Sequence, residues 1–102
     1  MTRYALRVDA NQTEIVEALR AAGATVEIIG LPTDLLVGIA GAHGPIFAFF
    51  ECKTLVGKRN PKPSKTTRVQ DAFFAKYAGY PVSLVDSVEC ALRHLSVLRG
   101  AV

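Results

Sequence analysis

The sequence has few cysteines, no tryptophan and no long apolar run. Its two cysteines, Cys52 and Cys90, stand inside apolar stretches without the spacing of paired metal ligands, so we expect buried, reduced thiols and no zinc site. No apolar run approaches the roughly 20 residues that a membrane span needs, and the first residues lack the charged-then-apolar order of a signal peptide. These absences predict a cytoplasmic protein that makes no use of a membrane.

Half of the 102 residues are apolar, which is enough to bury a core without a disulfide or a structural metal. We expect one domain over residues 1–102, with its core at about 9–98. The chain carries 12 lysines and arginines against 9 acids, a net charge of +3. This balance mildly favours an anionic partner such as nucleic acid.

The periodicity of apolar residues changes several times along the chain. The predicted elements, in order, are a helix from Asp9 to Gly23, strands over 25–29, 35–40 and 46–53, a loop over 54–65, a helix over 67–78, a strand over 82–85, and a last helix capped by Ser87. This order, αβββαβα, predicts an α/β domain in which helices flank a mixed sheet of about four strands.

Two charges interrupt the third predicted strand. Alternation along it places Glu51 and Lys53 on the same face as Phe47 and Phe49. Charges within an apolar strand are costly unless they are paired or bind a metal. Taken alone, the two residues are better explained by a strand that simply ends at Glu51, since strand ends often carry solvated charges.

Asp34 adds a second carboxylate beside this strand end. It begins the preceding predicted strand, and antiparallel pairing brings the start of one strand to the end of the next. Two carboxylates form a hard-oxygen site for magnesium or manganese, and Lys53 points into the same space. Phosphodiester hydrolysis uses this combination, because the metal activates water and the lysine orients it or stabilises negative charge.

The segments Pro32-Thr33-Asp34 and Glu51-Cys52-Lys53 resemble the motif of the PD-(D/E)XK nuclease superfamily. Over residues 9–96 the chain is similar to the small virus-type replication-repair nuclease domains (VRR-NUC) of that superfamily, which are often phage-encoded. The resemblance implies a restriction-endonuclease-like core and a Mg²⁺-dependent endodeoxyribonuclease, with Mn²⁺ as a substitute. It also implies a homodimer acting on branched DNA, such as four-way Holliday junctions, in the cytoplasm of a bacterial host.

The resemblance implies two further site residues. Glu14 corresponds to a glutamate of the first helix, as an additional metal ligand or water holder, and Gln70 to a glutamine that positions water or Lys53. Each also has a structural interpretation. Glu14 is favoured by the helix dipole as a solvated first-turn acid, and Gln70 is placed to close a capping box with Thr67.

A cationic segment follows the predicted site, with no acid between Glu51 and Asp71. Its candidate DNA-binding residues are Lys58, Arg59, Lys62, Lys65 and Arg68. Such a loop binds the DNA backbone by counterion release, although an ordinary solvated loop explains any one lysine equally well. The rival functions are a catalytically inactive DNA-binding or assembly protein that retains the nuclease fold, and a scaffold with no nucleic-acid role.

Aromatic residues cluster in the third predicted strand and the helix over 67–78. Their spacing predicts packing in the core in preference to a base-stacking surface. The residues concerned are Phe47, Phe49, Phe73, Phe74 and Tyr77.

Overall fold

The computed structural model describes residues 11–53, 55–56, 62–63 and 68–101. It is an α/β fold with a mixed four-stranded sheet flanked by helices, which confirms the predicted class; the helices and the main sheet follow the predicted order αβββαβα, with two short strands added after the third strand. The elements are α1 (Gln12–Ala21), β1 (Thr25–Ile28), β2 (Leu35–Gly41), β3 (Gly44–Cys52), β4 (Leu55–Val56), β5 (Lys62–Pro63), α2 (Arg68–Lys76), β6 (Val82–Val85) and α3 (Val88–Ala101).

The sheet has the strand order β1-β2-β3-β6. The first three strands form an antiparallel meander, and β6 lies parallel to β3 after the crossover that contains α2. In the β2–β3 hairpin, Leu35 pairs with Phe50 at the open end and Gly41 with Gly44 at the turn. This register places the start of β2 beside the end of β3, as the antiparallel arrangement predicts.

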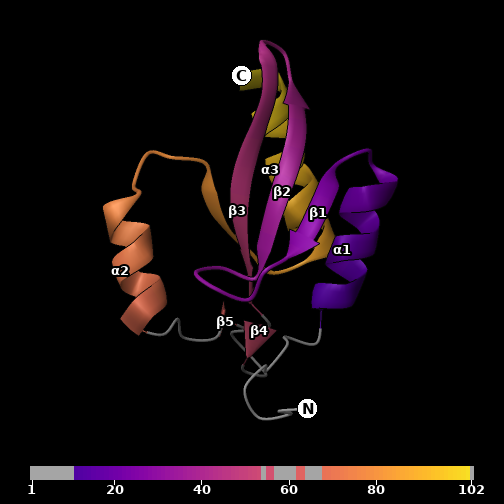
Figure 1. Ribbon diagram of the computed structural model, residues 1–102. Coiled ribbons are helices and arrows are strands. Elements are labelled where there is room, and N and C mark those ends of the chain that lie inside the picture. Colours follow the sequence, from indigo (N-terminus) through magenta and orange to yellow (C-terminus); the bar gives the residue numbers. More distant parts are fainter. Residues whose placement is uncertain (1–10, 54, 57–61, 64–67, 102) are drawn as a thin grey trace.

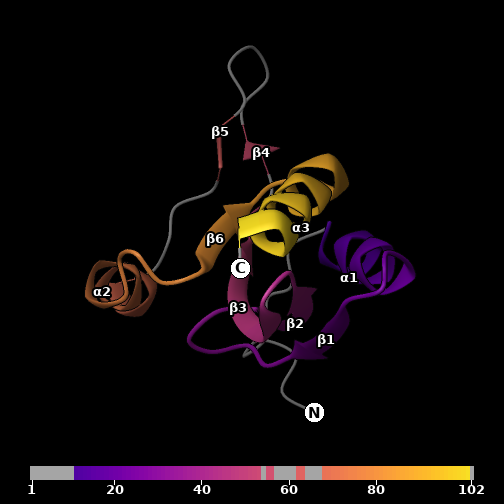
Figure 2. The same cartoon turned by 90° about the horizontal axis from the view of Figure 1, so that it is seen from above.

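Helices α1 and α3 cover one face of the sheet, and α2 lies on the other side, beside β3 and β6 (Figures 1 and 2). The core lies between the sheet and α1 and α3. It contains both cysteines, neither of which forms a disulfide. Its buried apolar residues are Ile15, Val16, Leu19, Ala24, Val26, Leu35, Val37, Ile39, Ala48, Phe50, Cys52, Val85, Cys90, Ala91 and Leu95.

The first helix begins later than predicted, at Gln12 and not at Asp9. Asn11 is its N-cap residue, but the Asn11 side chain makes no capping hydrogen bond. It donates instead to backbone carbonyls far along the chain, at Lys53 and Asp86. Asp9 itself lies outside the described residues.

The segment predicted as a loop over 54–65 contains two short strands. Residues Leu55–Val56 pair antiparallel with Lys62–Pro63, separately from the main sheet. The prediction of a loop was wrong at these positions because periodicity cannot detect strands of two residues. Proline is acceptable here because an edge strand does not need every N–H group.

The prediction that the aromatic cluster lies in the core was wrong. The Phe47 side chain is 65% exposed, and Phe49, Phe73, Phe74 and Tyr77 are only half-buried. The reason is that α1 and α3 both cover the opposite face, while α2 buries only Gln70 and leaves the Phe73 and Phe49 rings, which meet edge-on, half-exposed. One face of the sheet is thus left partly open.

Among the described residues, none of the helices combines the length and the apolar character that crossing a membrane would require.

Leu19 provides a test of the core. Its side chain is fully buried between α1 and the sheet. We expect Leu19→Ala to lower the free energy of unfolding by about 2–5 kcal/mol, measured by urea denaturation, because it removes buried methyl groups and leaves a cavity. Val97→Ala is the control, since Val97 on α3 is 62% exposed; its effect should stay within about 0.5 kcal/mol. Equal effects of the two substitutions would contradict this assignment of the core.

Candidate active site

The turn before β2 fixes the position of Asp34. The Asp34 carbonyl accepts hydrogen bonds from the backbone N–H groups of Ile29 and Gly30, at 2.9 and 3.2 Å. Thr33, which separates Pro32 from Asp34 in the motif, is fully buried, and its hydroxyl donates to the Leu35 carbonyl at 3.2 Å. Thr33 is therefore part of the turn that directs Asp34 towards β3.

Asp34 and the end of β3 exchange two hydrogen bonds. The Asp34 backbone N–H donates to Glu51 Oε1 at 3.0 Å. The Cys52 backbone N–H donates to Asp34 Oδ2 at 2.9 Å. Each strand thus holds a carboxylate of the other with a main-chain donor. The structure therefore brings Asp34 and Glu51 together, and their relative position depends on backbone atoms.

Lys53 and Gln70 complete the cluster. Lys53 Nζ lies 3.3 Å from Glu51 Oε2 and donates to Gln70 Oε1 at 3.4 Å. Gln70 Nε2 in turn donates to Glu51 Oε2. All three side chains are buried, with Glu51 only 2% exposed. Gln70, from the first turn of α2, is therefore hydrogen-bonded to both charged groups.

The electrostatics of Glu51 reflect this crowding. Burial raises the pKa of its carboxyl above the ordinary value of 4.5, and the negative charge of Asp34 raises it further. The Lys53 ammonium and the hydrogen bonds from Lys53 and Asp34 act in the opposite direction. Burial and the neighbouring Asp34 thus disfavour the ionised form of Glu51. Acids perturbed in this way are characteristic of functional sites.

Glu14 does not join this cluster. Its side chain is exposed on α1, whose buried stripe consists of Gln12, Ile15, Val16 and Leu19. Within the described part of the chain, no hydrogen bond or ion pair connects Glu14 with Asp34 or Glu51. Glu14, the acid that the resemblance assigns to the site, therefore faces away from the packed side of α1.

Most of the candidate DNA-binding residues lie where the structure gives no side-chain position. Lys58, Arg59 and Lys65 fall outside the described residues, and Lys62 is described only as a backbone member of β5. Arg68 is exposed at the start of α2, two residues before Gln70. One of the five cations is thus placed on the helix that contributes to the site.

Asn11 supports the site and was not predicted from the sequence. Its side-chain Nδ2 donates to the Asp86 carbonyl at 2.8 Å and to the Lys53 carbonyl at 3.3 Å. It thereby joins the start of α1 to the segments that follow β3 and β6. An asparagine before a helix is normally interpreted as a cap, so the sequence carries no signal for this long-range contact.

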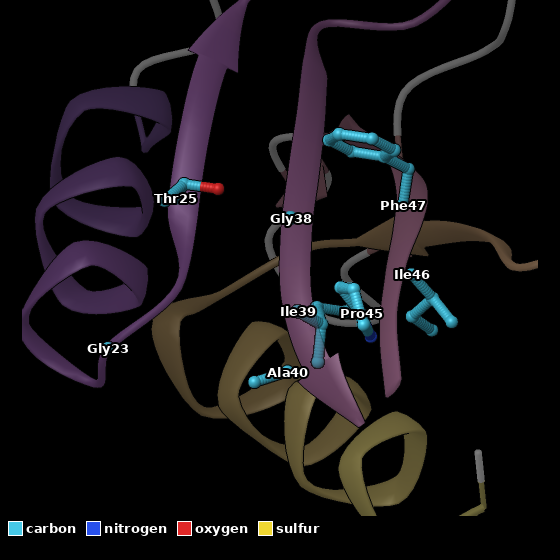
Figure 3. A pocket seen from close by; sticks show the side chains of 8 residues that line it. All are labelled: Gly23, Thr25, Gly38, Ile39, Ala40, Pro45, Ile46 and Phe47. Atoms are coloured by element: carbon cyan, nitrogen blue, oxygen red, sulfur yellow. The ribbon is translucent and has the colours of Figure 1, made fainter. Parts of the chain in front are cut away.

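A hollow at the other end of the sheet is a poor candidate for chemistry (Figure 3). It is lined by Gly23, Thr25, Gly38, Ile39, Ala40, Pro45, Ile46 and Phe47. None of these residues is charged. Gly38 lies between Thr25 and Phe47, and any side chain at Gly38 would collide with the Thr25 hydroxyl. We therefore place the candidate site at the end of β3, where the charged groups meet.

Comparison with known proteins gives no match: no protein-family model, no curated protein and no solved structure is similar to this chain.

The protonation of Glu51 can be measured by carboxyl ¹³C NMR in the presence of a chelator. We expect a midpoint above 4.5, because burial and Asp34 both disfavour the ionised form. Asp34→Asn should lower this midpoint by removing a negative charge, whereas Lys53→Ala should raise it by removing a positive one. A midpoint at or below 4.5, or the reverse order of the two variants, would contradict the electrostatic description of the site.

Proposed function

We propose that this chain is a metal-dependent endonuclease that hydrolyses DNA phosphodiester bonds. The observation that supports this most strongly is the meeting of Asp34, Glu51 and Lys53 at one end of the sheet. Glu51 is buried and Asp34 is half-buried beside it, so their negative charges repel each other, and a bound cation relieves that repulsion. A buried lysine beside them suits a reaction in which negative charge develops on a phosphate.

The donor set fits magnesium. Mg²⁺ is commonly held by one or two carboxylates, with water and substrate phosphate as its remaining ligands. Asp34 and Glu51 can supply these carboxylates, and Glu51 Oε1 accepts one hydrogen bond from the described residues, which leaves a lone pair for a cation. Histidines, cysteines and acids form no group of three or more in the described ranges, so a metal site there would rest on these two carboxylates, with water and phosphate as the other ligands. Mn²⁺ should substitute because it uses the same oxygen ligands.

The residues of the site have separate roles in the proposed reaction. A bound metal ion would lower the pKa of a water molecule and offset the charge of the phosphate. The Lys53 ammonium can hold the attacking water or stabilise charge on the phosphoryl oxygens. Gln70 accepts from Lys53 and donates to Glu51, so it fixes the orientation of both. The backbone N–H of Asp34 donates to Glu51 Oε1 and so helps to orient that carboxylate.

The enzyme hypothesis is tested with labelled four-way, flap, duplex and single-stranded DNA in magnesium, manganese or chelator. We expect cleavage with either metal and none with chelator. Glu51→Gln and Lys53→Ala should each lower the cleavage rate by about 100-fold or more, since each removes a group that acts on the metal, water or phosphate. Glu17→Gln is the charge-matched control, because Glu17 is exposed on α1, and it should cleave like the wild type. Persistent DNA binding without cleavage under every metal would instead favour the inactive binding protein.

Glu14→Gln, assayed in the same series, addresses the role implied by the resemblance. A metal ligand should behave like Glu51. An exposed acid should behave like Glu17, and the exposed position of Glu14 leads us to expect this second result. A decrease of about 100-fold in the cleavage rate would show that Glu14 acts at the site. It would also require a rearrangement of α1 on binding metal or DNA.

DNA is the proposed partner, and the cationic segment between β3 and α2 is its proposed contact. A protein that binds phosphates with lysine and arginine loses affinity steeply as salt increases. We expect the logarithm of the DNA association constant to fall linearly with the logarithm of salt concentration. Arg68→Ala should reduce that slope by about 0.9 if Arg68 contacts one phosphate. A slope near zero in the wild type would favour a scaffold with no nucleic-acid role.

Branched DNA as the preferred substrate and a homodimer as the active form belong to the same proposal. Exposed apolar side chains on the connection from β1 towards Asp34 offer contact area for a second copy. These are Ile28, Ile29 and Leu31, of which Leu31 is 70% exposed. Clusters of this kind often mark interaction sites on soluble proteins. A dimer formed there would place its two candidate sites near each other.

A further inference from the structure

A continuous row of aromatic rings extends from the candidate site along α2. The Phe49 ring meets the Phe73 ring edge-on at 5.3 Å between centroids, and Phe73 lies 4.9 Å from Tyr77. Tyr77 meets Tyr80 at 5.4 Å. These four residues, Phe49, Phe73, Tyr77 and Tyr80, are called the aromatic row below.

The aromatic row is a surface feature. Phe49, Phe73 and Tyr77 are half-buried, and Tyr80 is 65% exposed. The row lies on the side of the sheet that α1 and α3 leave uncovered, with α2 standing apart from those helices (Figure 2). Exposed rings in contact with one another remain apolar surface that water solvates poorly, and such surfaces on soluble proteins commonly bind a partner.

The row begins at the candidate site. Phe49 precedes Glu51 by two residues and shares its face of β3. Phe73 follows Gln70 by three residues, which places both on neighbouring positions of the α2 surface. Gln70 is hydrogen-bonded to Glu51 and Lys53. The carboxylate site and the row thus share β3 and the start of α2, so the rings are within reach of a polymer held at the carboxylates.

The charges on α2 favour an anionic partner, since Arg68 and Lys76 outnumber the single acid of the helix, Asp71. Lys76 Nζ lies 5.5 Å from the centre of the Tyr77 ring, and Arg68 is exposed at the start of the same helix. A purely apolar protein surface would gain nothing from cations beside the rings, whereas a phosphate backbone would. Rings interleaved with cations are the arrangement by which proteins bind single-stranded nucleic acid.

We propose that the aromatic row stacks against unpaired bases of a DNA strand whose phosphates lie at the Asp34–Glu51 site. Bases within a duplex have their faces covered by their neighbours, so only an unpaired stretch can offer them to the row. The row thus selects DNA that carries unpaired nucleotides beside the position of cleavage, such as a flap, an overhang or an opened junction. This inference rests on the proposed nuclease function for the nature of the strand and for where it is cut.

The test compares binding to a tailed duplex and to a blunt duplex of equal charge, by fluorescence anisotropy in chelator, so that no cleavage is needed. The wild type should prefer the tailed DNA. Tyr80→Ala should weaken binding to the tailed DNA about fivefold or more and leave blunt binding unchanged, because one stacking ring is lost. Tyr80→Phe, which retains the ring, and Val97→Ala, an exposed site on α3, should stay within about twofold of the wild type.

A second measurement uses the absence of tryptophan, since Tyr4, Tyr77 and Tyr80 are the only tyrosines and so the main fluorophores of the chain. Unlabelled oligothymidine should quench tyrosine emission, and Tyr80→Phe should reduce the amplitude of quenching while keeping the affinity. Equal losses of tailed and blunt binding in Tyr80→Ala, or no loss of either, would overturn the proposal. So would a shift from dimer to monomer in Tyr80→Ala without DNA, seen by sedimentation, because the row would then be a contact between two copies.

The outcomes separate this inference from the proposed function. Selective binding of tailed DNA by a protein that cleaves nothing with any metal would refute the nuclease and retain the aromatic row as a strand-binding surface. Metal-dependent cleavage without preference for unpaired nucleotides, unaffected by Tyr80→Ala, would retain the nuclease and refute the role of the row.

Discussion

The reciprocal hydrogen bonds between Asp34 and the end of β3 are the constraint on which the site depends. A buried carboxylate beside a second, half-buried one is unfavourable, yet here Glu51 accepts the N–H of Asp34, just before β2, and Asp34 accepts the N–H of Cys52 at the end of β3. Because the donors belong to the backbone, the acids keep their relative position as long as β2 and β3 remain paired. The turn around Thr33, the β2–β3 register and the Asn11 tether all contribute to keeping that geometry.

The two faces of the sheet differ in which residues they carry and in how far helices cover them. On one face, α1 and α3 bury a continuous apolar core that stabilises the strands. On the other face, the charged residues and the aromatic row lie beside α2, where less apolar surface is removed from water. Polar groups are costly to place inside a well-packed core. The face covered by α1 and α3 therefore supplies the stability, and the face beside α2 can carry the polar groups.

The sequence predicts that Asp34, Glu51 and Lys53 lie together, because the alternation of side chains along a strand and the antiparallel pairing of consecutive strands can both be inferred from short stretches of sequence. Gln70 is different, since only the resemblance distinguished a site residue from a capping residue, and its hydrogen bonds to Lys53 and Glu51 are made across elements. The aromatic cluster was misassigned because periodicity states which residues share a face and not whether that face is covered. Asn11 was missed for a related reason, as its partners at Lys53 and Asp86 are distant in the chain.

Helix α2 connects the two parts of the proposed DNA-binding surface. Its first turn carries Gln70, which is hydrogen-bonded to Glu51 and Lys53, and its far end leads into Tyr77 and Tyr80. Gln70 is the only buried residue of α2, whereas α1 buries Gln12, Ile15, Val16 and Leu19, so α2 has less buried surface to hold it on the sheet. A DNA strand that stacks on the rings would therefore contact α2, the same helix whose Gln70 orients Lys53. Recognition of unpaired bases and the arrangement of the reacting groups would then be coupled through one element.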